Sequence, residues 1–219
     1  MSIYVVGSSK NSFVIPDSIR KIFYVDKPHT GDNIDYLNPY YCELTALYYM
    51  WKHETDDIVG LEHYRRQFIG NNGLLSEGEI RRILATNDVI MYRCSVPANA
   101  AKHMVGAGKS SELALAMAVL NKCGGNKITD YFWSNLTGSY VYLGNMFVCR
   151  KELADKYCDF IFTLLRNFDK IHNFKTPRID GYIAEYFMEP WLRYNGYKIY
   201  DCARQVMDKS GRRKLLDWQ

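Results

Sequence analysis

The segment Gly60–Arg66 carries the densest group of chemically active side chains in this sequence. It ends an apolar run that predicts a buried strand, and it presents Glu62, His63, Arg65 and Arg66 at the end of that strand. Guanidinium groups match phosphate oxygens two at a time, so Arg65 and Arg66 suit a diphosphate or the charge on a departing nucleotide. The alternative interpretation is a surface salt-bridge cluster with Glu62.

Glu62 and His63 are also the weak candidates for binding a divalent cation such as Mn²⁺ or Mg²⁺, because carboxylate and imidazole groups are metal ligands. The sequence contains no Asp-x-Asp pair, which is the usual cation-binding motif of nucleotide-sugar enzymes. Metal dependence therefore stays open at this point. If no cation binds, the arginines must stabilise the charge that develops on a leaving diphosphate.

A second group of polar residues lies ahead of a predicted helix that begins at Asn38-Pro39. Asp32 and Asn33 offer carboxylate and amide groups to a ribose or a base, and a helix N-terminus favours anions. The same residues are equally explained as a turn followed by a helix cap. Glu43 lies among apolar residues of the first helical turns, so we expect a buried acid that needs an arginine partner.

The third group is Pro177–Glu185, where a loop leads into another predicted helix. Asp180 and Glu185 are both candidates for a general base that takes the proton from an attacking hydroxyl. Asp180 is equally interpreted as a helix cap. Glu185 is equally interpreted as an ion-pair partner of Arg178 or Arg193.

The elements that must position these groups alternate between strand and helix. This order predicts an α/β domain with a mainly parallel sheet covered by helices, in which ligands bind beyond the carboxyl ends of the strands. Gly144-Asn145 interrupts one strand, which suggests a bulge or a close approach to a ligand. We expect strands at 3–7, 21–25, 57–62, 88–92, 140–149 and 197–200, helices at 40–52, 76–85, 110–122, 151–167 and 180–194, and a loop at 97–108.

Length and composition fit one soluble domain. The chain has 219 residues and a formal net charge of +4, and its 18 tyrosines suit either a core or a surface that stacks sugars or bases. No signal peptide and no apolar run of membrane-spanning length is recognised, so we expect a cytoplasmic protein. The six cysteines show no zinc or disulfide spacing and are interpreted as reduced core residues.

We divide the chain into a domain at 1–205 and a basic amphipathic tail at 206–219. The tail contains Lys209, Arg212, Lys214 and Trp218, and it is interpreted as a solvated segment or as a peripheral contact with an anionic membrane. The mild charge and the lack of a recognised binding motif argue against nucleic acid as a partner.

Several motifs resemble a family of bacterial capsule and exopolysaccharide glycosyltransferases that was long catalogued as a domain of unknown function. The resemblance covers nearly the whole chain, and some family members are similar to galactofuranosyltransferases. The middle of the chain, at 97–139, matches less clearly, and Gly7-Ser8-Ser9-Lys10 stands where the family has Thr-His-Lys. The motifs are NPYYCELTALY with Trp51-Lys52, GLxHYRR at 60–66, Asn145-Met146-Phe147, and RxxGxxAE at 178–185.

The resemblance implies a GT-A-like, Rossmann-like fold and a UDP-sugar donor, with a growing surface polysaccharide or a lipid-linked oligosaccharide as acceptor. Direct displacement would invert the anomeric carbon. A non-catalytic module that binds nucleotides or glycans is the alternative function. The expected donor-binding residues are Gly7, Asp32, Asn33, Glu43, His63, Tyr64, Arg65 and Arg66; the acceptor-binding residues are Asn145, Met146 and Arg178; the catalytic residues are Asp180 and Glu185.

Overall fold

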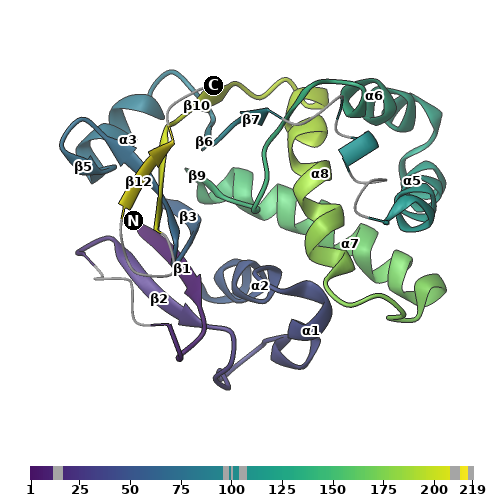
Figure 1. Cartoon of the computed structure of the whole chain (residues 1–219), viewed down its shortest axis with the longest axis horizontal. Helices are drawn as coiled ribbons and strands as arrows, with labels where there is room; N and C mark the ends of the chain where they lie inside the picture. The colour runs from purple at the N-terminus through teal and green to yellow at the C-terminus, as the bar shows by residue number, and fades with distance from the viewer. Residues whose placement is uncertain (12–16, 96–98, 100, 104–107, 208–212, 217–219) are drawn as a thin grey trace.

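A mixed sheet forms the centre of the molecule (Figure 1). The structure, a computed structural model, describes residues 1–11, 17–95, 99, 101–103, 108–207 and 213–216. The six central strands have the order β2-β1-β3-β9-β6-β10, and among these described strands β9 alone runs against the others. The predicted mainly parallel sheet is thus confirmed. The bounds are β1 Ser2–Gly7, β2 Arg20–Tyr24, β3 Ile58–His63, β6 Val89–Met91, β9 Phe147–Arg150 and β10 Ile199–Asp201.

Helices cover both faces of this sheet. Consecutive strand residues point to opposite sides, so apolar side chains on each face are buried under helices. In β9, for example, Phe147 and Cys149 join the larger core, whereas Val148 joins the smaller one. None of the described helices combines the length and the apolar character needed to cross a bilayer. The larger core includes residues of α2 Leu44–His53, α5 Ser110–Gly124, α6 Asn126–Leu136, α7 Lys151–His172 and α8 Ile179–Tyr194, and the smaller core includes residues of α3 Glu77–Ile83.

The helix expected at 40–52 is broken near its start. A short 3₁₀ helix, η1 (Asp35–Leu37), leads into α1 (Asn38–Tyr41), and α2 begins only at Leu44. Cys42 separates α1 from α2 with a φ of 51°, a left-handed value that is uncommon for a residue with a side chain. The break places Glu43 immediately before the first turn of α2.

The segment after β3 is a tight hairpin, which the sequence analysis did not predict. His63 of β3 pairs with Arg66 of β4 (Arg66–Gly70), and Tyr64 and Arg65 form the turn. The β4 strand continues an antiparallel extension with β5 (Gly73–Leu74), β11 (Arg204–Met207) and β12 (Arg213–Leu216). Part of the predicted tail therefore forms a strand, while Lys209, Arg212 and Trp218 lie outside the described residues.

The strand expected at 140–149 is interrupted at Gly144-Asn145, as the sequence analysis predicted. It splits into β8 (Tyr140–Val141), which pairs with β7 (Cys94–Ser95), and the longer β9. Gly144 and Asn145 both have positive φ values, 90° and 51°. We call residues 142–146 the β8–β9 bend. Of the loop expected at 97–108, residues 97, 98, 100 and 104–107 lie outside the described part, and 101–103 are helical.

Candidate active site

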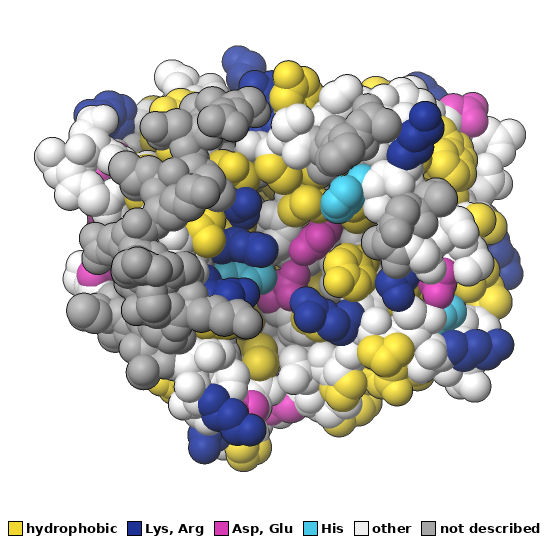
Figure 2. All heavy atoms as spheres, viewed as in Figure 1, with side chains coloured by type: hydrophobic (Ala, Val, Ile, Leu, Met, Phe, Trp, Pro, Cys, Tyr) yellow, Lys and Arg dark blue, Asp and Glu magenta, His cyan; other side chains and the backbone are white. Residues whose placement is uncertain are grey.

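A hollow opens between the sheet and α8, in the middle of the face shown in Figure 2. Basic, acidic and histidine side chains gather in it. The cavity measures about 220 Å³, which is enough for the reacting end of a ligand rather than for a whole nucleotide-sugar. We call it the Glu185 cavity. Its lining residues are Arg66, His103, Lys109, Leu143, Arg178, Tyr182, Glu185 and Tyr186.

Glu185 is the acidic residue that lines this cavity. It lies on α8, one turn after Tyr182, and Arg178, the N-cap residue of that helix, lines the same cavity. Burial, followed by repulsion from Glu43, raises the pKa of Glu185 to about 8. The backbone amide of Gly144 and the guanidinium groups nearby act in the opposite direction. A carboxyl group that exchanges its proton near neutral pH is suited to general base chemistry.

A buried amide connects the elements around Glu185. The Nδ2 of Asn145 donates to Oε1 of Glu43 at 2.8 Å and to the carbonyl of Gly181 at 3.1 Å. The Asn145 side chain thus joins the start of α2, the β8–β9 bend and the first turn of α8. Asn145 is 2% exposed, and its Oδ1 is buried with no hydrogen-bond partner among the described residues. Its amide group therefore supports the site in this structure, and contact with a sugar acceptor stays a prediction.

His63, at the end of β3, also contacts the β8–β9 bend. Its Nε2 donates to the carbonyl oxygen of Gly144, so that nitrogen carries the proton. Burial, with Arg66 and Arg204, lowers the pKa of His63. A Cβ at Gly144 would lie 3.5 Å from Nη1 of Arg66 and 3.6 Å from Nε2 of His63. Both distances are ordinary van der Waals contacts, so the left-handed φ of 90°, and not a lack of space, is what favours glycine at this position.

Two arginines from the antiparallel extension bring positive charge to this region, one of them at the cavity itself. Arg66 of β4 lines the cavity, and Arg204 of β11 stacks over the ring of Tyr92 at 3.8 Å. Nε and Nη1 of Arg204 are buried and have no hydrogen-bond partner among the described residues. Buried donors without partners are costly, so this region is suited to bind an anion such as a diphosphate.

The predicted donor-binding residues separate into two places. Gly7 and Tyr64 meet at the carboxyl ends of β1 and β3, where a Cβ on Gly7 would lie 3.1 Å from Cβ of Tyr64. Asp32 instead accepts from Tyr48, and Asn33 donates to carbonyls of its own loop. These two residues shape the loop ahead of η1 and do not line the Glu185 cavity.

The predicted arginine pair is also divided. Arg66 lines the cavity, whereas the guanidinium of Arg65 lies 5.3 Å from the ring centre of its neighbour Tyr64. The backbone carbonyl of Arg65 accepts from Met207. The two arginines follow one another at a hairpin turn, so their side chains leave the backbone in different directions.

Three other predicted residues do not lie at the cavity. Glu62 is fully buried and pairs with Arg20 at 2.8 Å, so its carboxylate is not available to a metal ion or to Arg65 and Arg66. Among the described residues, no group of three or more His, Cys, Asp and Glu side chains could hold a metal ion. Met146 is buried in the smaller core, which does not support contact with an acceptor.

Asp180 is the third predicted site residue that does not lie at the Glu185 cavity. It is fully buried in the first turn of α8 and faces Asp169 of α7, away from the lining of the Glu185 cavity. Burial and then Asp169 raise the pKa of Asp180 to about 8. Arg178 occupies the N-cap position, so Asp180 is not the cap either. The structure thus separates the two carboxyl groups that the sequence analysis grouped as candidate bases.

Comparison with known proteins places the chain in a family. A family model described as a domain of unknown function, DUF4422, matches residues 4–196. The chain belongs to the DUF4422 family. The solved apo structure of the bifunctional glycosyltransferase WbbM is similar, with a TM-score of 0.78 and 24% identity over 93% of this chain. This likeness shows a GT-A-like fold, as predicted.

The match covers 44% of the WbbM chain, so this DUF4422 chain corresponds to less than half of that protein. A search of curated proteins found no match to the sequence.

Several residues at the cavity of this DUF4422 chain were missed by sequence reasoning. Tyr182 and Tyr186 share a helical face with Arg178 and Glu185, and this spacing could have revealed them. Arg204 gave no such signal, because it reaches the site only through pairing of β11 with β4. His103 and Lys109 line the cavity from a segment in which no motif was recognised.

Proposed function

We propose that this protein is a glycosyltransferase that moves a sugar from a UDP-sugar to a growing surface polysaccharide or a lipid-linked oligosaccharide. The observation that carries the proposal is Glu185, a half-buried carboxyl group with its pKa raised to about 8, in a cavity that also contains Arg66. The GT-A-like fold and the likeness to the bifunctional glycosyltransferase WbbM support it.

In the proposed reaction, the oxygen of an acceptor hydroxyl attacks the anomeric carbon of the donor sugar. The bond between that carbon and the diphosphate oxygen breaks, and UDP leaves with the bonding electron pair. The hydroxyl proton passes to the ionised carboxylate of Glu185, which acts as the general base. A single displacement of this kind inverts the configuration of the anomeric carbon. Glu43 keeps the pKa of that base high, and Asn145 fixes the position of Glu43.

The donor is proposed to lie across the carboxyl ends of β1 and β3. Glycine at position 7 leaves room for the side chain of Tyr64, whose ring is proposed to face the base or ribose. The diphosphate is proposed to lie near Arg66 and Arg204, where Nε and Nη1 of Arg204 have no hydrogen-bond partner among the described residues. Positive charge fixed at this place stabilises the negative charge that develops on the leaving group.

A divalent cation does not fit the residues predicted for it. Glu62 is already paired with Arg20, and Nε2 of His63 is occupied by the carbonyl of Gly144. The arginines are therefore proposed to stabilise the leaving group. Activity with added EDTA, compared with activity with added Mn²⁺, measures whether a cation contributes.

The test is release of UDP from candidate donors in the presence of an acceptor. UDP-galactofuranose and UDP-galactopyranose are the first donors to compare, because of the family resemblance, and NMR of the product gives the anomeric configuration. Transfer with inversion supports the full proposal. Binding of donor without any UDP release, across a panel of donors and acceptors, would instead favour a non-catalytic binding module.

A further inference from the structure

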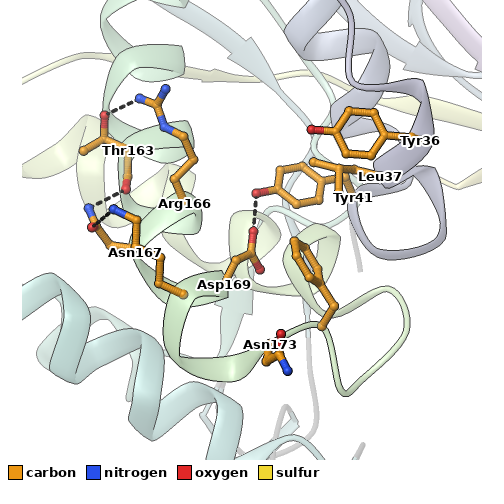
Figure 3. Close-up of a pocket in the computed structure, with 10 residues that line it drawn as sticks. Tyr36, Leu37, Tyr41, Thr163, Arg166, Asn167, Asp169 and Asn173 are labelled. Carbon is orange, nitrogen blue, oxygen red and sulfur yellow. Dashed lines mark hydrogen bonds between the residues drawn. The ribbon is translucent and has the colours of Figure 1, made fainter.

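A second cavity, larger than the Glu185 cavity, lies elsewhere on the molecule. It measures about 760 Å³, within the usual range of small-molecule sites, and shares no lining residue with the Glu185 cavity. One wall comes from η1 and α1, and the opposite wall comes from the C-terminal half of α7 (Figure 3). We call it the α7 pocket. Tyr36, Tyr41, Arg166, Asn167, Asp169 and Phe174 are the lining residues on which the argument depends.

Aromatic rings form the first wall and the rim. Tyr36 is 77% exposed, the highest exposure among the large hydrophobic residues in the described part of the chain. Phe174 lines the pocket with a φ of 52° and packs on Tyr40 with ring centres 4.9 Å apart. Rings exposed beside a cavity can cover the apolar face of a ligand and can also offer a hydroxyl group.

Planar polar groups form the opposite wall. Arg166 and Asn167 lie on α7 across from Tyr36 and Tyr41 in Figure 3. Internal hydrogen bonds hold both in place, since Nε of Arg166 donates to the carbonyl of Phe162 and Nδ2 of Asn167 donates to that of Thr163. Fixed guanidinium and amide groups pair well with neighbouring hydroxyl groups on a ring.

Acidic groups lie at the floor of the pocket. Asp169 is 9% exposed, its Oδ2 accepts from Tyr41 at 2.6 Å, and its Oδ1 is buried with no hydrogen-bond partner among the described residues. Asp180 lies beyond it, and burial raises the pKa of both carboxyl groups. Oδ1 of Asp169 therefore adds a hydrogen-bonding atom at the floor that suits a ligand rich in hydroxyl groups.

We propose that the α7 pocket is a second saccharide-binding site, which holds one or two neutral sugar residues of a glycan. The rings of Tyr36 and Phe174 contact the C–H face of a sugar, and Arg166 and Asn167 bond to its hydroxyl groups. This site goes beyond the proposed transfer reaction and does not rest on it, because binding here involves neither Glu185 nor a nucleotide.

Binding is tested by saturation-transfer NMR with methyl glycosides of galactose, glucose, mannose and rhamnose, and with lactose, each at tens of millimolar. We expect at least one of them to bind the native protein. Tyr36→Ala should raise the dissociation constant about fivefold or more, because the stacked ring is lost. Asn167→Ala should weaken binding as well. Tyr140→Ala is the matched control, since Tyr140 is 51% exposed and lies outside the pocket.

Three outcomes would overturn the proposal. One is that none of these sugars binds, and a second is that binding is unchanged in Tyr36→Ala but lost in Arg66→Ala, which would place the sugar in the Glu185 cavity. The third is that inorganic phosphate binds in the α7 pocket and the sugars do not. Circular dichroism of each variant checks that it is folded. The assay needs no donor, so a negative result leaves the proposed transfer reaction untouched.

Discussion

Asp180 and Glu185 lie on the same helix and share a pKa raised to about 8, yet their surroundings differ. Asp180 is enclosed between α7 and α8 beside Asp169, and neither of its carboxyl oxygens has a hydrogen-bond partner among the described residues. Glu185 instead lines an open cavity beside Arg66 and Arg178. A raised pKa reports burial and like charge in both places, so access to a ligand decides which carboxyl group is suited to catalysis.

The largest expected effect comes from Glu185→Gln. Loss of the general base should lower kcat about 10³-fold, while the dissociation constant of the donor changes little. Rate measurements and donor titration calorimetry on the same preparation check this. Glu189→Gln is the matched control, because Glu189 lies one turn further along α8 and pairs with Arg193. Equal losses in the two variants would contradict a special role for Glu185.

The second test compares the two neighbouring arginines at the hairpin. Arg66→Ala should lower kcat/KM about 10²-fold, because it removes a fixed positive charge beside the leaving group. Arg65→Ala should have a clearly smaller effect, since Arg65 does not line the cavity. Steady-state kinetics, with thermal melting to compare stability, separates the two. If Arg65→Ala is the more damaging change, the diphosphate lies elsewhere.

The third test addresses the enclosed acid. Because the folded-state pKa of Asp180 is raised from 3.8 to about 8, its contribution to stability is full below about pH 4 and is lost as pH rises towards 8. The amide that Asp180→Asn introduces does not titrate, and it can still donate to Asp169. We therefore expect the variant to exceed the native protein in unfolding free energy by about 1 kcal/mol or more near pH 8.

Urea unfolding of both proteins at several pH values measures this difference. The two curves should converge at acid pH, and the variant should keep its transferase activity. A variant that folds normally but transfers no sugar would instead assign Asp180 a direct role in the reaction.

The smallest expected effect comes from Glu43→Gln. The base must be ionised, so kcat/KM should rise with pH through about 8 in the native protein. Removal of the charge on Glu43 lowers the pKa of Glu185 and should move this rise to lower pH, with a rate gain of about threefold near neutral pH. The carbonyl oxygen of the introduced amide can still accept from Asn145. A pH–rate profile with an unchanged midpoint would show that Glu43 does not act on the base.

The sequence predicted most of the fold and only part of the site. Periodic apolar residues and the capping box at Ser76 and Glu79 correctly predicted the central strands and the start of α3. The interruption at Gly144-Asn145 was also predicted, because glycine marks a break in a strand. Local patterns do not reveal which distant elements pair, so the hairpin at Tyr64-Arg65 and the arrival of Arg204 were missed.

The same limit explains why the sequence could not tell which of the two candidate bases, Asp180 or Glu185, lies at the cavity. Asp180 and Glu185 look alike in sequence, since both are acids in the first half of one predicted helix. Their partners, Asp169 and Glu43, lie on other elements and become neighbours only through packing. The UDP-sugar donor, the cytoplasmic location and the membrane contact of the tail stay predictions.

The pairing of β11 with β4 has a consequence for how the protein is made. Gln205 and Gln67 bond across 138 positions of sequence, and Arg204 reaches the site through the same pairing. During translation, the residues of β11, up to position 207, must have left the ribosome before this contact can form. A nascent chain that has folded β1, β2 and β3 but not yet β11 should therefore lack full affinity for the diphosphate. Full binding of the diphosphate has to wait until β11 has been synthesised.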